Sequence, residues 1–523
     1  MLQRRDIAIA ALFGVGTALY IAPFLSPGWQ IYEDAAMLFR YAEHVAAGHG
    51  IVWNVGEPPV DGATDLLYMW ILAGLHWLGI GLESAARGTS AAAHISTVAL
   101  VYVGVRRFSG GNSLAAALSA VFVAIGPGKA YVAGGFGTPV FALCVTLTWL
   151  ATLRLVEKPS TRAAIVCGIL SVVMGIARPE GALLAALIVT SLFVYWHGSD
   201  ARRFIHPIVV IGAVLGGTYW LWRWSYFGYP LPNPYYRKGG GRIYLSNFLI
   251  TAKYGALLIA PFLAPLLLGL GSYVADRHRF RATLLAAIPV FGFLAAWVLL
   301  SNEMNFFRRF QYPVVPIAAI SWPLWIPDRI REYWRTLITG TPLQRAAIAV
   351  TAAALLAVTV RYQHEAYFPP RWQDDLYKIG EMLAPYQDRG YTIAISEAGL
   401  IPFYSKWKAI DIWGLNDEWI AHNGVVTAAY LDRIKPEVVV FHAQCAPSRP
   451  GDQWEEMEQA MALYTRNRPY VLAAHGDNGA GWSVLYYVRP DFPDAEKISS
   501  VFAAAVKSSA QPPAPLRACA TTS

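Results

Sequence analysis

The chain has 523 residues, of which 55% are hydrophobic and only 15% are charged, and its mean hydropathy is +0.38. A soluble globular protein carries about 25% charged residues, so the composition excludes an ordinary soluble protein and predicts a polytopic membrane protein. The net charge of +8 does not indicate nucleic-acid binding, because the Lys and Arg residues lie in short loops between apolar segments, where they act as topology signals.

The N-terminal segment is cationic and then apolar. Arg4 and Arg5 precede an apolar run from Ile7 to Leu25. This run is longer than the apolar region of a signal peptide, and no small-residue cleavage site follows it. We therefore interpret it as an uncleaved first span that starts in the cytoplasm.

Residues 26–65 form a long polar stretch, which we interpret as the first outer loop. Apolar residues recur at helical spacing from Met37 to Val45 and polar ones fall largely on the other side, so we expect an amphipathic helix at the membrane interface. The acidic pair Glu33 and Asp34 begins this helix. These carboxylates either cap the helix or act as a general base or cation ligand near a low-dielectric surface.

Twelve apolar segments are long enough, or nearly so, to cross a bilayer. The cationic loops alternate sides from Arg106 onward and put the C-terminal part outside. A chain that starts inside and ends outside crosses an odd number of times, so we expect about 11 transmembrane helices, with segment 66–82 re-entrant or split. The segments are 7–25, 66–82, 91–105, 113–130, 138–156, 163–177, 181–197, 207–226, 252–272, 283–301, 311–326 and 344–360.

The loops expected on the outer side contain all the motif-like sequences. Two cationic clusters there suit a phosphate, because Arg presents forked donors and Lys a point charge; interfacial anchoring is the alternative. Arg178 and Glu180 are expected to form a local ion pair. The clusters contain Arg237, Lys238, Arg242, Arg308 and Arg309.

The sequence changes character after Arg361. Short β-rich runs at 391–395, 438–441 and 482–488 alternate with helical stretches such as 453–465, which predicts a soluble extracytoplasmic α/β domain over 362–506. Residues 507–523 are expected to be a disordered tail.

Several kinds of site have no support in the sequence. The four cysteines have no CxxC spacing, so the sequence implies neither a zinc site nor a disulfide framework. A disulfide between Cys445 and Cys519 in an oxidising compartment stays open. The chain has no GxxxxGK[ST] or HExxH sequence and no nucleophile elbow, which argues against a nucleotide-driven pump or a metalloprotease.

The outer motifs, in this order, resemble those of bacterial GT-C glycosyltransferases, and the branch most similar is the mycobacterial terminal arabinofuranosyltransferases. The resemblance covers about Arg4 to Asp417. Its motifs are FRYAEHVAAGHGIVWNVGEPPVDGATDLLY, ARPEG, RWSYFGYPLPNPYYRKG, NEMNFFRRFQYPVVP and SEAGLIPFYSKWKAIDIWGLND. Two positions depart from the family pattern: Gly137 stands where a Glu is expected, and Asp65 where an Asn is common.

The resemblance implies a GT-C-like transmembrane catalytic domain over 1–361 in a bacterial inner membrane. It implies transfer of a sugar, arabinofuranose or another pentose or hexose, from a polyprenyl-phosphate donor to an extracytoplasmic cell-envelope glycan or glycolipid. Asp34, with Glu33 adjacent, would be the catalytic residue. The donor phosphate would contact Lys238, Arg237, Arg308 and Arg309, and the substrate cavity would contain Arg40, His49, Trp53, Asn54, Arg178, Glu180, Asn233, Tyr236 and Glu303.

Three points stay open at this stage. The sequence assigns no cofactor, and whether the enzyme needs a divalent cation stays open. A transporter or lipid flippase is a second interpretation, although its usual charged residues at mid-bilayer depth have only Lys129 and His94 as candidates here. An inactive GT-C-like scaffold is a third, because of Gly137.

Overall fold

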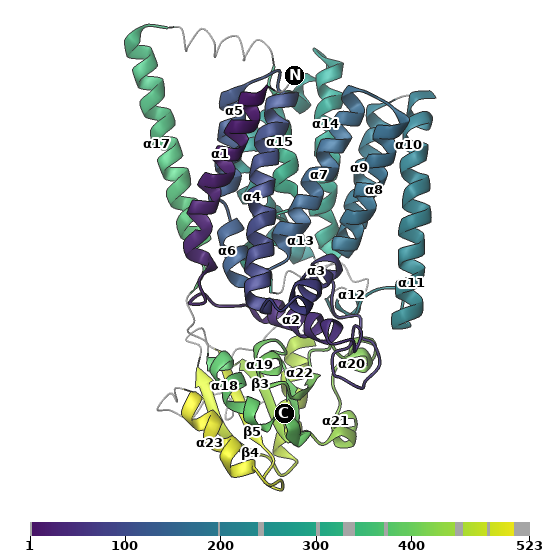
Figure 1. The fold of residues 1–523 in the computed structure, drawn as a ribbon, viewed down its shortest axis with the longest axis vertical. Coiled ribbons are helices and arrows are strands. Elements are labelled where there is room, and N and C mark those ends of the chain that lie inside the picture. The colour runs from purple at the N-terminus through teal and green to yellow at the C-terminus, as the bar shows by residue number, and fades with distance from the viewer. Residues whose placement is uncertain are drawn as a thin grey trace.

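The computed structural model describes residues 3–196, 199–238, 245–299, 304–327, 340–370, 375–444, 453–477 and 482–506. Figure 1 shows a bundle of long helices, with a smaller part made of strands and helices against one end of it. The N-terminus lies at the other end of the bundle. Several predicted positions lie outside the described residues: Arg242, Glu303, Cys445, Cys519 and the tail.

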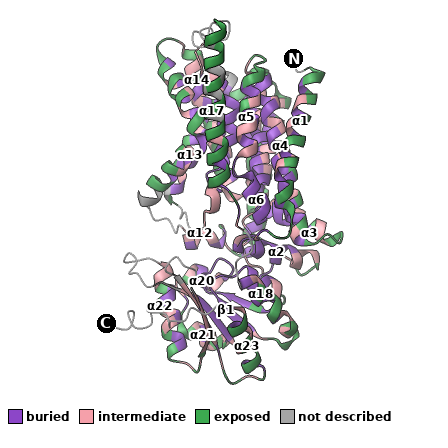
Figure 2. Cartoon of the chain, turned by 90° about the vertical axis from the view of Figure 1, so that its left-hand side faces the viewer, coloured by how far each residue is buried: buried purple, intermediate pink, exposed green. Residues whose placement is uncertain are grey.

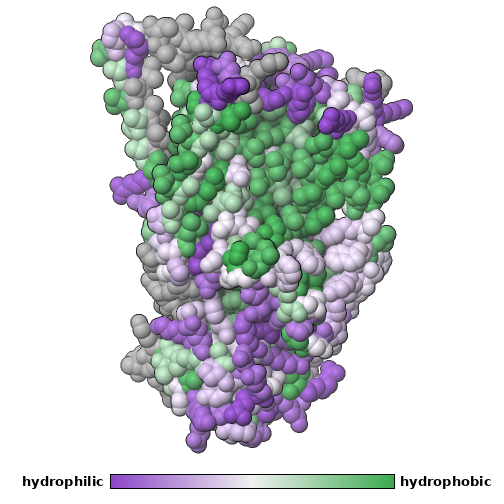
Figure 3. All heavy atoms as spheres, in the orientation of Figure 1, coloured by the Kyte–Doolittle hydropathy of each residue, from purple (hydrophilic) through white to green (hydrophobic). Residues whose placement is uncertain are grey.

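The helices of the bundle include seven segments that are long and apolar enough to cross a membrane: Arg4–Leu25, Leu82–Phe108, Ser113–Gly134, Thr138–Glu157, Ala201–Phe227, Phe248–Tyr273 and Arg277–Ala296. Hydrophobic residues cover a broad region of the face of the bundle that Figure 3 shows. The chain is therefore a multi-pass membrane protein, and the count of 11 spans stays a prediction.

The bundle combines contacts between consecutive helices with contacts between helices far apart in the sequence. Within it α4 packs against α1, α5 and α7, and α9 packs against α8 and α14. The helices are α1 (Arg4–Ile21), α4 (Leu82–Phe108), α5 (Ser113–Ile125), α6 (Gly128–Gly134), α7 (Thr138–Glu157), α8 (Thr161–Ala177), α9 (Pro179–Tyr195), α10 (Ser199–Ile211), α11 (Gly217–Phe227), α13 (Leu245–Leu270), α14 (Arg277–Ala296), α15 (Val314–Trp325) and α17 (Pro342–Ala366).

Segment 66–82 forms a short helix, α3 (Leu66–Trp77), followed by a turn. At 1.5 Å per residue its 12 residues extend about 18 Å, well short of the roughly 30 Å hydrocarbon core. It packs against α2 (Glu33–Ala46) and α4. This helix alone is too short to cross a bilayer.

The expected amphipathic helix is present as α2, but its polar side is not exposed to solvent. Its buried residues include Glu33 and Arg40 as well as the apolar ones. Figures 1 and 2 show α2 between the bundle and the α/β part. The predicted helix is present, and the burial of Glu33 and Arg40 was not predicted: both side chains bind backbone groups of the C-terminal part.

The C-terminal part contains one five-stranded sheet in the order β2-β1-β3-β5-β4. The runs predicted as strands form β1 (Thr392–Ile395), β3 (Val438–Gln444) and β5 (Trp482–Val488); β2 (Lys408–Asp411) and β4 (Val471–Asp477) were not predicted. β1 pairs in parallel with β2 and β3, and β5 is antiparallel to β3 and β4. The helices are α18 (Asp375–Leu383), α19 (Leu400–Ser405), α20 (Glu418–Asn423), α21 (Ala428–Ile434), α22 (Gln453–Arg466) and α23 (Ala495–Ala505).

Candidate active site

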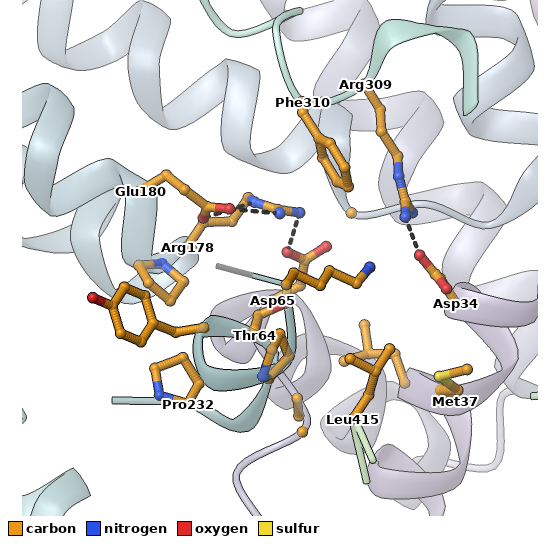
Figure 4. Close-up of a pocket in the computed structure, with 18 of the residues that line it drawn as sticks. Asp34, Met37, Thr64, Asp65, Arg178, Glu180, Pro232, Arg309, Phe310 and Leu415 are labelled. Carbon is orange, nitrogen blue, oxygen red and sulfur yellow. Dashed lines mark hydrogen bonds and ion pairs between the residues drawn. The ribbon is translucent and has the colours of Figure 1, made fainter. Parts of the chain in front are cut away.

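A cavity of about 390 Å³ lies where the bundle, α2 and the C-terminal part meet. Its wall combines residues far apart in sequence, and it is polar at two places and apolar elsewhere (Figure 4). The lining residues include Asp34, Met37, Leu38, Tyr41, Asp65, Gly135, Phe136, Gly137, Arg178, Glu180, Leu183, Tyr235, Lys238, Trp297, Arg309, Phe310 and Leu415. Tyr235 and Lys238 belong to the short helix α12 (Asn233–Lys238).

Asp34 is the carboxylate at one polar end of the cavity. Its Oδ2 forms an ion pair with Arg309 (Figure 4), while its buried Oδ1 accepts no hydrogen bond from the described residues. Burial alone would raise the pKa of Asp34, but the charges of Arg309 and Lys238 outweigh it and hold this pKa below its ordinary value of 3.8. The carboxylate is thus ionised, and its Oδ1 has no donor among the described residues.

Neither acidic residue caps α2. The N-cap is Tyr32, and it has no side-chain capping bond. Glu33 instead accepts hydrogen bonds at Oε2 from the backbone N–H groups of Gly399 (2.6 Å) and Leu400 (2.9 Å), at the start of α19. The capping interpretation is wrong for α2, and Glu33 serves the junction with the C-terminal part rather than the cavity.

A strained turn sends two adjacent arginines in different directions. Phe307 and Arg308 have φ of 53° and 59°, a left-handed conformation that costs energy in residues other than glycine. Arg309 enters the cavity and lies over the rings of Phe136 (4.4 Å) and Phe310 (4.9 Å). Arg308 donates instead to the hydroxyl of Tyr367 and does not line the cavity, contrary to expectation.

α12 separates its two basic residues in the same way. Lys238 lines the cavity, and among the described residues it makes no hydrogen bond or ion pair. Arg237 faces the C-terminal part, where Nη1 donates to the carbonyl of Gly424 (2.6 Å) and the guanidinium lies over Trp413 (4.3 Å). The cavity thus receives one predicted cation from each of the two clusters, Lys238 and Arg309.

The second polar end of the cavity contains Asp65, Arg178 and Glu180 (Figure 4). Arg178 pairs with Glu180 at 3.1 Å, as expected, and also with Asp65 at 2.5 Å. Burial raises the pKa of Asp65 above its ordinary value, although Arg178 acts in the opposite direction. Arg178 also lies 5.9 Å from the ring centres of Phe141 and Phe310, which limits its movement.

The two departures from the family pattern are neighbours in space. A Cβ added at Gly137 would lie 2.7 Å from Oδ2 of Asp65 and 2.7 Å from Cδ1 of Tyr68. A side chain at 137 and this position of Asp65 therefore exclude each other. The Asp65 carboxylate thus lies beside the position where the resemblance leads one to expect a Glu, a proximity that the sequence alone does not indicate.

Three predicted cavity residues tie the first loop to the C-terminal part instead. Arg40 is 3% exposed and donates to the carbonyls of Trp53 (2.8 Å), Pro402 (2.6 Å) and Trp407 (2.9 Å) and to Asn54 Oδ1 (3.0 Å). The indole of Trp53 and the amide of Asn54 both donate to the carbonyl of Ala409. Their placement in the cavity was wrong, because backbone carbonyls consume their donors.

The remaining predicted cavity residues also lie elsewhere. His49 is exposed in the turn after α2, and Asn233 is buried at the start of α12, where its N–H donates to the Asp61 carbonyl (3.0 Å). Tyr236 packs against His422, with ring centres 4.3 Å apart. In the part of the chain that the structure describes, no group of three or more His, Cys, Asp or Glu residues is arranged to hold a metal ion.

Comparisons with known proteins identify one matching family model and several solved structures with a similar fold. Residues 361–486 match the family described as "Domain of unknown function (DUF8728)". No curated protein matches the sequence.

Solved structures match over most of the chain. ArnT from Cupriavidus metallidurans in the apo state is 15% identical with a TM-score of 0.59, and the match covers 91% of this chain and 97% of ArnT. Its complex with undecaprenyl phosphate is also 15% identical, with a TM-score of 0.57 and coverage of 92% and 98%.

Two further structures match. The archaeal oligosaccharyltransferase AglB from Archaeoglobus fulgidus, in complex with an inhibitory peptide and a dolichol-phosphate, is 12% identical, with a TM-score of 0.55 and coverage of 94% of this chain and 74% of AglB. The arabinofuranosyltransferase AftD from Mycobacteria is 17% identical, with a TM-score of 0.50 and coverage of 93% and 42%. At such identities the likeness concerns the fold. The chain therefore has the fold of the GT-C membrane glycosyltransferases.

Proposed function

We propose that the protein is a GT-C-type glycosyltransferase that moves a sugar from a polyprenyl-phosphate donor to a hydroxyl group of an extracytoplasmic cell-envelope glycan or glycolipid. The observation that carries this proposal is the Asp34 carboxylate, which lines the cavity beside Arg309 and Lys238 and whose buried Oδ1 accepts no hydrogen bond from the described residues. Similar folds have been solved with undecaprenyl phosphate and with a dolichol-phosphate.

In this proposal Asp34 is the general base. The acceptor oxygen attacks the anomeric carbon, the bond from that carbon to the phosphate oxygen breaks, and the acceptor proton moves to Asp34 Oδ1. Polyprenyl phosphate leaves with its added negative charge. General-base catalysis of this kind contributes about 10²–10⁴-fold to a rate.

The two cavity cations would stabilise the departing phosphate. Lys238 has no partner among the described residues, and the buried Nε of Arg309 also lacks an acceptor there. Preorganised donors at a site shielded from bulk water stabilise developing charge more than they would in solution. Arg309 would also hold Asp34 ionised, so it would link the base to the leaving group.

The positions of the cationic residues support one orientation of the protein in the membrane. The N-terminus lies at the end of the bundle away from the C-terminal part (Figure 1), and Arg106 joins it there through an ion pair with Asp6 (2.9 Å). The positive-inside rule places that end in the cytoplasm. The cavity and the C-terminal part would then lie outside a bacterial inner membrane, where the C-terminal part would position the acceptor.

Binding of polyprenyl phosphate to the purified protein tests the phosphate site. Loss of one charge-assisted hydrogen bond costs about 1.5–3 kcal/mol, so Lys238→Ala should weaken binding by at least about tenfold, and Lys238→Arg should restore part of it. Arg237→Ala is the matched control, since this neighbour faces away from the cavity. Equal affinity in wild type and Lys238→Ala would refute the phosphate assignment.

A further inference from the structure

The two polar ends of the cavity carry opposite net charge. Asp34, Arg309 and Lys238 give one end a formal charge of +1, whereas Asp65, Glu180 and Arg178 give the other a formal charge of −1. A donor whose phosphate lies at the cationic end keeps its negative charge away from the anionic end, where a hydroxyl-bearing group can donate hydrogen bonds to the carboxylates. The anionic end is therefore the natural place for a sugar ring.

Asp65 has one oxygen available at this end. Its Oδ1 is occupied by Nη1 of Arg178 at 2.5 Å, and no hydrogen bond from the described residues reaches Oδ2. The side chain keeps 16% exposure inside the cavity. Arg178 is itself fixed by Glu180 through Nε (3.3 Å) and Nη2 (3.1 Å), so the carboxylate is held in place rather than free to rotate.

Gly137 keeps open the space that Oδ2 of Asp65 uses. A Cβ at this position would meet that oxygen at 2.7 Å. The ring of Tyr68, on the other side, cannot retreat, because it is 1% exposed and its hydroxyl lies 3.1 Å from the carbonyls of both Ala86 and Gly135. Any side chain at 137 would therefore force the Asp65 carboxylate to shift from its present position.

We propose that Asp65 determines which donor sugar is used, by accepting a hydrogen bond at Oδ2 from a hydroxyl group of a neutral sugar ring. This inference rests on the proposed function. A carboxylate at this position accepts hydrogen bonds from the hydroxyl groups of a sugar and repels a sugar acid. Asp65 is a specificity-determining residue in this account, and Asp34 remains the base.

Two lipids separate the sugar contact from the phosphate contact: bare polyprenyl phosphate, and polyprenyl phosphate carrying a neutral pentose or hexose. Their affinities for purified wild type, Asp65→Asn and Gly137→Ala are measured in lipid nanodiscs. A hydrogen bond to a charged group justifies an expected loss of about tenfold or more for the sugar-bearing lipid in both variants, with bare lipid unchanged. Lys238→Ala is the contrasting variant, and it should weaken both lipids alike.

Each other outcome overturns the proposal. An equal loss of both lipids in Asp65→Asn would make Asp65 a structural part of the cavity. An unchanged preference in Asp65→Asn, or loss of acceptor binding alone, would assign the sugar contact elsewhere. If wild type binds bare lipid but no panel sugar improves its affinity, the sugar subsite fails while the phosphate site stands; if wild type binds neither lipid, the proposed function fails with it.

Discussion

Replacement of Asp34 by Asn separates catalysis from architecture. The amide keeps the shape of the side chain and can still accept a hydrogen bond from Arg309, but it cannot take the acceptor proton. Transfer should therefore fall by at least about 100-fold, the lower limit for general-base catalysis.

The ion pair between Asp34 and Arg309 sets the size of the stability effect. Breaking a fully buried pair costs about 3–5 kcal/mol, whereas an exposed pair is worth about 1 kcal/mol or less. The side chains are 17% and 7% exposed, and Arg309 keeps its contacts with two aromatic rings. We therefore expect a loss of between about 1 and about 3 kcal/mol for Asp34→Asn.

Glu33→Gln is the matched control, because it neutralises the adjacent carboxylate, whose Oε2 binds two backbone N–H groups of the C-terminal part rather than facing the cavity. Weakening these charge-assisted bonds costs about 1–3 kcal/mol, which is similar to the stability loss expected for Asp34→Asn. Both variants are assayed for sugar transfer per amount of folded protein, and for thermal unfolding. The reasoning is refuted if Asp34→Asn loses activity only in proportion to its folded fraction, or if both variants lose activity equally.

Three other predictions address the junction, the base and the topology. Arg40→Ala removes four buried hydrogen bonds and leaves the carbonyls of Trp53 and Trp407 without this donor, so it should destabilise the protein by about 3 kcal/mol or more; resistance to limited proteolysis at the wild-type level would contradict this. Asp34 acts as a base when ionised and its pKa lies below 3.8, so transfer should stay constant from about pH 7 to about pH 5 and be lost only as the pH falls through that lowered pKa; an acid limb near pH 6 in the pH–rate profile would argue against this base. Cysteines placed at the exposed positions Ala429 and Ser113 should be labelled by an impermeant reagent only at 429 in intact cells, and labelling of 113 alone would reverse the orientation.

The sequence indicated which segments carry the site but not which of two adjacent residues faces it. Three predicted pairs divide in this way: Asp34, Lys238 and Arg309 line the cavity, whereas Glu33, Arg237 and Arg308 face other partners. Successive side chains on a helix point about 100° apart, so both members of a helical pair cannot reach the same cavity. For the two arginines, a left-handed turn that no local sequence signal marks makes the choice.

Contacts between distant segments were beyond any local pattern. The approach of Gly137 to Asp65 joins positions 72 residues apart, and the bonds of Arg40 reach residues more than 350 positions away. Arg40, Trp53 and Asn54 have the composition of a polar cavity, yet they fill a junction that exists only once the C-terminal part has folded against α2. The apolar spans, by contrast, are readable because 20 or so consecutive apolar residues have few other uses.

Transfer of labelled sugar by the purified protein tests the central claim most directly. The protein is placed in lipid vesicles with a panel of polyprenyl-phosphate sugars, each labelled in the sugar, and with cell-envelope glycan as acceptor; glycan-bound label and released polyprenyl phosphate are both measured. The account predicts that at least one donor with a neutral sugar yields equal amounts of the two products, and that Asp34→Asn lowers both by at least about 100-fold. A folded wild-type protein that releases no polyprenyl phosphate from any donor and does not bind this lipid would contradict it.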